Sequence, residues 1–196
     1  MFESRNHFYK NLLSEDECEE IKISFLKEIE QPFFKNLDNP TLTPNSIGCV
    51  NLPETLKYTD TILEIIRKDY QKENWNIEFE NSYTRIYKKN SCLNMHTDRP
   101  ELDITLTLNI DGIQDWALCI SNVMYETWRA DYGWDDYTDL TKYEKDYNKY
   151  ITPRGCGVAS YGKSYPHWRY PLVCKDDEYV IQLFYHFSYW KPAELA

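Results

Sequence analysis

Hydrophobic residues recur at helical spacing in two stretches of the first seventy residues. In the first stretch, Ser14 is followed three positions later by Glu17, and apolar residues then return every three or four positions up to Ile29. A serine with a glutamate three residues further on is typical of a helix start, and Pro32 ends the pattern. A second helix is predicted from Pro53 to Gln71. The proline- and asparagine-rich stretch between these two helices is predicted to be a loop.

After Trp75 the hydrophobic pattern changes from helical spacing to alternation. The clearest alternation runs from Leu102 to Ile110, where every second residue is Leu or Ile. Such a pattern is typical of a strand with one buried face. Shorter alternating or apolar runs predict further strands at residues 77–87, 116–120, 158–161 and 179–189.

Helices followed by many short strands indicate an α+β chain that is mainly β. We expect a single domain over residues 1–196, with a double-stranded β-helix (jelly-roll) core and N-terminal helices packed outside it. A Tyr-, Trp- and Asp-rich segment, residues 125–150, interrupts the strands. We interpret it as an insertion or lid, with helix expected over residues 138–150.

Charge and composition narrow the classes of partner. The formal net charge is −10, so neither a nucleic acid nor an anionic membrane is expected, since both need clustered cationic residues. A small-molecule substrate that is cationic or neutral fits this charge better. No apolar run is long enough for a membrane span or a signal sequence, which predicts a soluble, cytoplasmic protein. The six cysteines form no Cys-x-x-Cys pair and are expected to be free thiols.

Two residues in the strand region have the chemistry of metal ligands. His96 and Asp98 are one residue apart, so in an extended segment their side chains share a face and reach one ion. A second imidazole would complete a two-histidine, one-carboxylate set, which is typical of non-haem iron(II). His167 is the candidate, because His186 lies in an apolar strand and His7 lies near the terminus. A solvated surface pair is the alternative for a His-x-Asp motif.

The order of these motifs resembles the iron(II)- and 2-oxoglutarate-dependent dioxygenases of the prolyl-4-hydroxylase-like branch. The similarity runs from Phe8 to about Tyr189. One part of it is similar to a subgroup in which Trp-Arg follows the distal histidine. The motifs that carry the resemblance are Tyr83-Thr-Arg-Ile-Tyr87, His96-Thr-Asp-Arg-Pro100, His167-Trp-Arg-Tyr-Pro-Leu172 and Gln182-Leu-Phe-Tyr185.

This resemblance implies an enzyme in which His96, Asp98 and His167 hold iron(II). It also implies 2-oxoglutarate and dioxygen as co-substrates, with succinate and carbon dioxide released. Related halogenases lack the carboxylate that Asp98 supplies, so the family pattern implies hydroxylation. The substrate is expected to be a small molecule. The alternatives are a hydroxylase of prolyl or other protein residues and a jelly-roll binding module without catalysis.

The chain departs from the family pattern at the residue that binds the far carboxylate of 2-oxoglutarate. Many members have Arg or Lys at the start of the last core strand, where this chain has Glu178 and Tyr179. Arg169 is the predicted replacement, because it lies two residues after His167 and a guanidinium binds a carboxylate through two hydrogen bonds. Lys175 is the alternative anchor, and a surface or structural role is the alternative for Arg169.

Three further residues are candidates for contacts in the site. Tyr87 resembles the family tyrosine that donates its hydroxyl to the same carboxylate, and Thr107 is a candidate for another donor. An ordinary strand position is the alternative for each. Arg99 either meets the substrate or pairs with Asp103.

Overall fold

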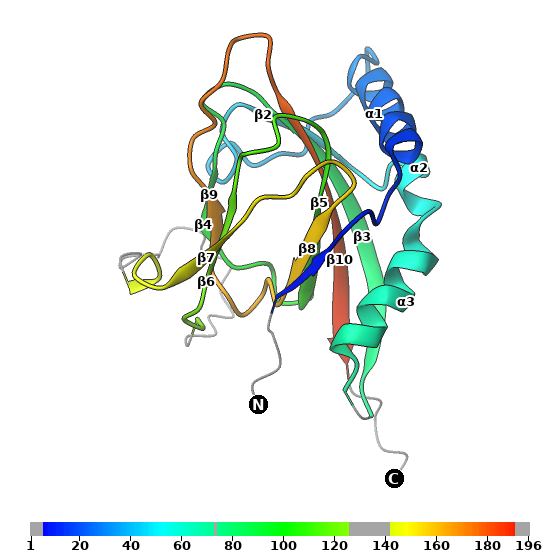
Figure 1. The fold of residues 1–196 in the computed structure, drawn as a ribbon. Coiled ribbons are helices and arrows are strands. Elements are labelled where there is room, and N and C mark those ends of the chain that lie inside the picture. The colour runs from blue at the N-terminus through cyan, green and yellow to red at the C-terminus, as the bar shows by residue number, and fades with distance from the viewer. Residues whose placement is uncertain (1–5, 73, 126–141, 191–196) are drawn as a thin grey trace.

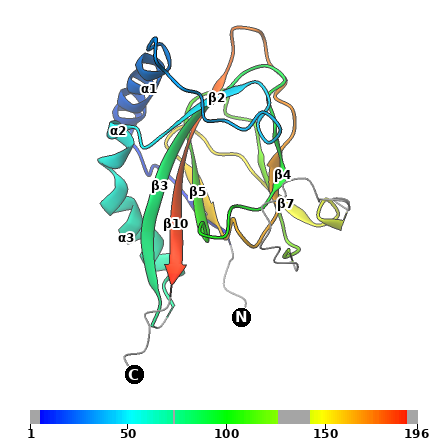
Figure 2. The same cartoon turned by 180° about the vertical axis from the view of Figure 1, so that it is seen from behind.

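The strands form two antiparallel sheets, with the helices on the outer side of the larger one (Figures 1 and 2). The computed structural model describes residues 6–72, 74–125 and 142–190. Within these ranges the elements follow the order β1 His7–Tyr9, α1 Glu15–Ile29, β2 Ser46–Val50, α2 Pro53–Leu56, α3 Thr59–Tyr70, β3 Asn76–Tyr87, β4 Leu93–His96, β5 Ile104–Gly112, β6 Leu118–Ser121, β7 Tyr147–Tyr150, β8 Gly157–Ser160, β9 His167–Arg169 and β10 Val180–Trp190.

The order of the strands is that of a jelly-roll. The larger sheet has the order β1-β8-β5-β10-β3-β2, and the smaller sheet has the order β4-β9-β6-β7. Long β3 and β10 pair along almost their whole length at the centre of the larger sheet. The predicted mainly β architecture with N-terminal helices outside the core is confirmed.

The main hydrophobic core lies between α1, α3 and the larger sheet. The alternation predicted for β5 is confirmed there, because Ile104, Leu106, Leu108 and Ile110 all belong to this core. The intervening Thr105 and Thr107 face the other side of the sheet and line a cavity. The two faces of one strand therefore serve packing and the site separately.

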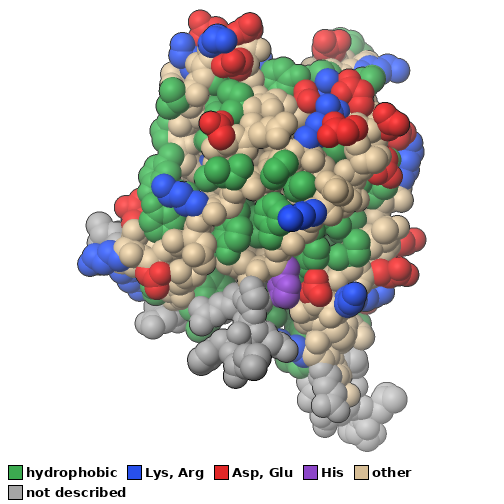
Figure 3. All heavy atoms as spheres, viewed as in Figure 1, with side chains coloured by type: hydrophobic (Ala, Val, Ile, Leu, Met, Phe, Trp, Pro, Cys, Tyr) green, Lys and Arg blue, Asp and Glu red, His purple; other side chains and the backbone are tan. Residues whose placement is uncertain are grey.

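The start of α1 follows the predicted capping pattern. The Ser14 side chain accepts a hydrogen bond from Glu17 N, and the Glu17 carboxylate accepts one from Ser14 N. Figure 3 shows acidic and basic side chains gathered over this helix, where Arg154 contacts Glu15 and Glu19. No described helix is both long enough and apolar enough to cross a bilayer.

The helix predicted over residues 53–71 is interrupted, so that part of the prediction is wrong. It consists of α2 and α3, with a turn between them. The carbonyl oxygen of Thr55 accepts a hydrogen bond from the buried Tyr185 hydroxyl at 2.6 Å. The same oxygen also accepts from the backbone N–H of Tyr58 at 3.3 Å, which closes a turn where a continuous helix would have its bond from residue 59.

The helix predicted over residues 138–150 is also wrong where the structure describes it. Tyr147–Tyr150 is strand β7, which pairs with β6. Residues 126–141, which contain most of the predicted lid, lie outside the described residues. Strands β1, β4, β7 and β9 are three or four residues long. Their sequences show neither an apolar run nor a long alternation, unlike the region of the equally short β6.

Strand β3 exchanges its two faces part-way along. Ile77 and Phe79 pack in the helix-side core, whereas Asn81 lines the cavity on the opposite side. In the ladder with β10, His186 pairs with Asn81 but Phe187 pairs with Phe79. One residue of β3 is thus extra, which defines a β-bulge. The bulge turns the second half of the strand toward the cavity.

Candidate active site

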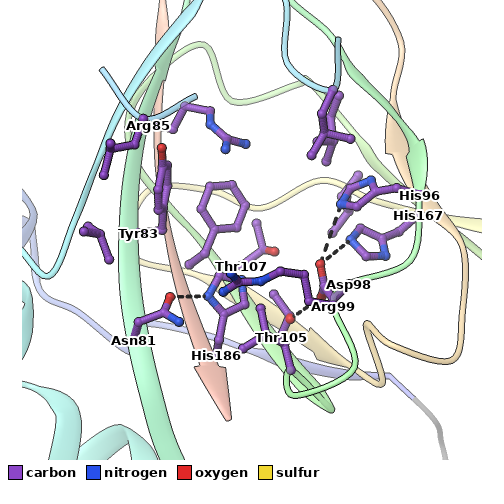
Figure 4. A pocket seen from close by; sticks show the side chains of 17 residues that line it. Asn81, Tyr83, Arg85, His96, Asp98, Arg99, Thr105, Thr107, His167 and His186 are labelled. Carbon is purple, nitrogen blue, oxygen red and sulfur yellow. Dashed lines mark hydrogen bonds and ion pairs between the residues drawn. The ribbon is translucent and has the colours of Figure 1, made fainter. Parts of the chain in front are cut away.

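A cavity of about 360 Å³ lies between the two sheets (Figure 4). Both sheets supply its walls, so residues far apart in the sequence meet there. Its polar lining comes from β3, β4, β5, β9 and β10 and from the segment after β4. The residues are Asn81, Tyr83, Arg85, His96, Asp98, Arg99, Thr105, Thr107, His167 and His186.

The three predicted metal ligands come together in this cavity. His96 of β4 and His167 of β9 are cross-strand partners, and their ring centroids are 4.2 Å apart. The Nε2 atom of each ring lies 3.6 Å from Oδ1 of Asp98. Potential ligand atoms of the three side chains all lie within 4.8 Å of one another.

Backbone carbonyls orient both imidazoles. Nδ1 of His96 lies 2.9 Å from the carbonyl oxygen of Asn94, and Nδ1 of His167 lies 3.1 Å from that of Tyr165. A carbonyl only accepts, so each Nδ1 carries the proton and donates it. Nε2, which points toward Asp98, is then the nitrogen of each ring that a metal ion would bind in place of a proton.

The Asp98 carboxylate is held by its neighbours. Oδ2 accepts a hydrogen bond from the Thr105 hydroxyl, and the backbone N–H of Asp98 donates to Gly162 O at 3.0 Å. A Cβ on Gly162 would lie 1.9 Å from Oδ2. Only glycine at position 162 therefore leaves room for the carboxylate in this position.

Burial and mutual charge set the protonation of the three side chains. Burial lowers the pKa of His96. Burial alone would raise the pKa of Asp98, but the charge of His167 and hydrogen bonds from both histidines hold it well below its usual value. Burial would likewise lower the pKa of His167, and the Asp98 carboxylate raises it instead. Two imidazoles and an ionised carboxylate are a donor set that fits iron(II).

Arg169, the predicted anchor for 2-oxoglutarate, is buried behind the cavity wall and is absent from the lining. Its Nη1 donates to the carbonyl oxygen of Trp116, and its guanidinium lies 4.9 Å from the centroid of the Trp116 ring. Its Nε and Nη2 have no hydrogen-bond partner. Burial lowers the pKa of Arg169 to about 10. The alternative, Lys175, is largely exposed and pairs with Glu178.

Arg85 is the deep cation of the cavity, and the sequence prediction missed it. It lies on β3 with Tyr83 and Tyr87, on the face that the bulge turns inward. Its Nε lies 2.9 Å from Oδ1 of Asp38, and its Nη1 donates to the Tyr87 hydroxyl at 3.0 Å. Burial would lower the pKa of Arg85, but the oxygens of Tyr87 and Asp38 outweigh it and raise the pKa. The alternation Tyr83, Arg85, Tyr87 was a signal that could have identified it.

The other three residues predicted to contact ligands in the site are Thr107, Tyr87 and Arg99, and Tyr87 does not line the cavity. Thr107 lines the cavity as expected, whereas Tyr87 is fully buried behind Arg85. Arg99 lines the cavity and pairs with Glu101 at 3.2 Å, while Asp103 pairs with Lys163. The expected alternative of an Arg99–Asp103 pair is therefore not what forms.

His186 also lines the cavity, although the sequence favoured a core or surface position for it. Its Nδ1 lies 2.8 Å from Oδ1 of Asn81, its partner across the β3–β10 ladder (Figure 4). Burial lowers the pKa of His186 to about 4. The ring is thus neutral at physiological pH, with Nδ1 as donor and Nε2 as acceptor.

Several solved structures share this arrangement of strands and helices. The non-haem α-ketoglutarate-dependent epimerase SnoN from nogalamycin biosynthesis matches with a TM-score of 0.73 and 8% identity, over 99% of this chain and 84% of that chain. HygX from Streptomyces hygroscopicus, solved with nickel and 2-oxoglutarate bound, matches with a TM-score of 0.67 and 13% identity, over 95% and 83% of the two chains. The chain has the fold of the 2-oxoglutarate-dependent oxygenases.

A viral prolyl hydroxylase has the same oxygenase fold. The collagen prolyl hydroxylase of Paramecium Bursaria Chlorella virus-1, solved as a 2-oxoglutarate complex, matches with a TM-score of 0.61 and 12% identity, over 94% and 96% of the two chains. No family model matches the sequence, and no curated protein matches it. The likeness to the oxygenases is therefore one of fold, and the chemistry must be argued from the cavity.

Proposed function

We propose that the protein is an iron(II)- and 2-oxoglutarate-dependent oxygenase that hydroxylates a small molecule. The convergence of two imidazole Nε2 atoms on one carboxylate oxygen is the observation that carries this proposal. His96, Asp98 and His167 would hold the metal. A surface pair is the alternative explanation of the His-x-Asp motif, but both histidines are buried and their Nδ1 atoms are already committed to carbonyls.

Iron(II) with a bound 2-oxoacid and dioxygen would supply the oxidising chemistry, with one oxygen atom going to succinate and the other to the substrate, and with carbon dioxide released. The chain itself supplies orientation. Thr105 and Gly162 fix the carboxylate of Asp98, and the buried walls restrict water. A catalytically inactive binding module would have no need for this complete and oriented ligand set.

Arg85 is proposed to hold the far carboxylate of 2-oxoglutarate, in place of Arg169. Arg85 reaches the cavity, whereas Arg169 lies outside its lining and donates to the Trp116 carbonyl. Thr107 lies in the same cavity and can add a hydroxyl donor. Tyr87 would act through Arg85, because its hydroxyl accepts from the guanidinium.

An anaerobic titration with iron(II) and 2-oxoglutarate tests this function. We expect a visible charge-transfer absorption from the chelated keto acid in the wild type and its loss in His96→Ala. Arg85→Gln should weaken 2-oxoglutarate binding by more than about tenfold, because a charge-assisted hydrogen-bonded pair is lost.

Two controls accompany this titration. His7→Ala removes a histidine outside the cavity lining and should leave the absorption unchanged. Arg169→Gln should weaken binding less than Arg85→Gln. The reverse order would assign the anchor to Arg169, and no absorption in folded, metal-loaded wild type would reject the function.

The cavity supports a small substrate. Its volume of about 360 Å³ lies within the usual range for small-molecule sites, roughly 300 to 1,000 Å³. Among the similar structures, HygX was solved with hygromycin B and SnoN with nogalamycin RO. A protein-residue hydroxylase is the second candidate, because prolyl hydroxylases share the fold.

Of the cationic and neutral substrates that fit the net charge, we propose a neutral polar one. Asp98 is the only carboxylate among the described lining residues, and it is a proposed metal ligand. A cation would find no other counter-ion on this wall. Asn81 and His186 instead offer neutral hydrogen-bonding groups. A charge-sorted panel of hydroxylated and amine compounds, tested for stimulated 2-oxoglutarate turnover, distinguishes the two classes.

A further inference from the structure

The loop before β2, residues 36–45, forms part of the cavity wall and is fixed at two points. Leu37 and Leu42 line the cavity. At one point, Asn94 of β4 donates from its backbone N–H to Leu42 O at 2.9 Å and from its side chain to Thr41 O at 2.6 Å. At the other point, Asp38 contacts Arg85 of β3. The loop therefore spans the cavity between the strand of a proposed metal ligand and the strand of the proposed co-substrate anchor.

The Asp38 carboxylate is almost fully buried, with 2% of its side chain exposed. Its Oδ1 accepts from the Tyr83 hydroxyl at 2.6 Å and from Arg85 Nε at 2.9 Å. Its Oδ2 accepts from the Ser46 hydroxyl at 2.5 Å. A Cβ on Gly48 would lie 2.8 Å from Oδ1, so the backbone also leaves room for this carboxylate. The fold therefore supplies this buried carboxylate with three hydrogen-bond donors, as a buried charge requires.

The charges around Arg85 create a conflict when a second anion binds. Asp38 already neutralises the guanidinium charge. The far carboxylate of 2-oxoglutarate would bind the same guanidinium, and two carboxylates close together repel each other in a site of low dielectric. The hydrogen bond from Nε to Asp38 nevertheless holds the guanidinium in the direction of the cavity.

We infer that Asp38 is a positioning residue for the co-substrate with two opposing effects. Its hydrogen bonds orient Arg85 and so favour 2-oxoglutarate, while its negative charge lowers the affinity for 2-oxoglutarate. This inference rests on the proposed function, in which Arg85 holds the far carboxylate. It predicts that removing the charge and removing the hydrogen bonds change the affinity in opposite directions.

Asparagine can separate the two effects, because the hydrogen bonds at position 38 tolerate an amide. The amide oxygen would still accept from Tyr83 and Arg85. The amide N–H would face Ser46 Oγ, whose single hydroxyl hydrogen could then turn from position 38 to Thr43 O at 2.8 Å. Asp38→Asn therefore removes one charge and keeps the local geometry, whereas Asp38→Ala removes both.

Anaerobic titration of the iron(II)-loaded full chain with 2-oxoglutarate, followed by its charge-transfer absorption, tests the inference. We expect Asp38→Asn to bind 2-oxoglutarate at least about threefold more tightly, because a like charge is gone. Asp38→Ala should bind it more weakly than Asp38→Asn, because both variants lack the charge and only asparagine keeps the hydrogen bonds that orient Arg85. Equal weakening in both variants, or no change in either, would show that Asp38 has only a structural role.

Two controls make the result specific. Glu20→Gln removes an exposed carboxylate that pairs with Lys57 on the helix side, so it changes the net charge equally and should leave the affinity unchanged. 2-Oxobutyrate has no far carboxylate, so Asp38→Asn should not tighten its binding. Tighter binding of both keto acids would overturn the inference.

Failure of this inference is distinguishable from failure of the proposed function. If wild type shows no absorption with iron(II) and 2-oxoglutarate, the function fails. If wild type shows it and the variants bind alike, only the role of Asp38 fails. Should Asp38→Asn not fold, Ser46→Ala keeps the charge and removes one donor to the carboxylate. It should weaken 2-oxoglutarate binding, and unchanged binding in that variant would overturn the positioning role.

Discussion

At the scale of single residues, the supporting positions matter as much as the ligands. The spacing of His96 and Asp98 predicted that the two side chains would meet, because alternate residues of an extended segment share a face. The structure brings them together with His167. The residues that hold them were not predictable, since Gly162 and Thr105 carry no motif and act through long-range contacts.

Gly162→Ala tests this dependence on a supporting residue. The new methyl group would lie 1.9 Å from Asp98 Oδ2 and 2.9 Å from Thr105 Oγ1, so the carboxylate must move. Iron(II) affinity should fall roughly tenfold or more, as for other residues that support metal ligands. The measurement is an anaerobic iron(II) titration.

Substitutions of Thr105 provide the matched comparison for that titration. Thr105→Val removes the hydroxyl donor to Asp98 and should follow Gly162→Ala, whereas Thr105→Ser keeps the hydroxyl and should bind iron(II) like the wild type. Wild-type affinity in both Gly162→Ala and Thr105→Val would show that the position of the carboxylate does not depend on these contacts.

At the scale of elements, the bulge in β3 explains why strand prediction succeeded while site prediction was incomplete. The alternation from Ile77 to Tyr87 identified the strand. It did not show that Ile77 and Phe79 face the helices while Arg85 faces the cavity. A bulge leaves no pattern in the local sequence, because only the register with β10 reveals it. The anchor was therefore sought on β9, at Arg169.

Deletion of Glu80, the residue of β3 that the ladder skips, should remove this exchange of faces. Either the helix-side core residues or the cavity residues of β3 would then lie on the wrong side. We expect a loss of stability above about 3 kcal/mol, because apolar residues leave the core and polar ones enter it. Glu80→Ala keeps the residue count and should cost little. Urea unfolding followed by circular dichroism compares the two, and equal stability would contradict the role of the bulge.

At the scale of the whole molecule, buried histidine makes stability depend on pH. Burial lowers the pKa of His186 from 6.5 to about 4 in the folded chain. Between these values the unfolded chain binds a proton that the folded chain does not, so the free energy of unfolding falls as pH decreases from about 6.5 to about 4. Above that range the effect is absent.

His186→Gln should reduce this acid-side loss by about 1–3 kcal/mol in the metal-free protein. Urea unfolding at a series of pH values measures it. If the free energy of unfolding fell equally with decreasing pH in wild type and His186→Gln, the buried, neutral state of His186 would be contradicted.

The division of the cavity between the two sheets has a mechanical consequence. The smaller sheet supplies the two histidines, whereas the larger sheet supplies Arg85 and Thr107. A bound metal chelated by a co-substrate that also reaches Arg85 would link the two sheets across the cavity. The distance between the sheets would then be set by the length of a five-carbon diacid. Loss of that diacid would leave the two sheets held together only by their packing and by the chain segments that connect them.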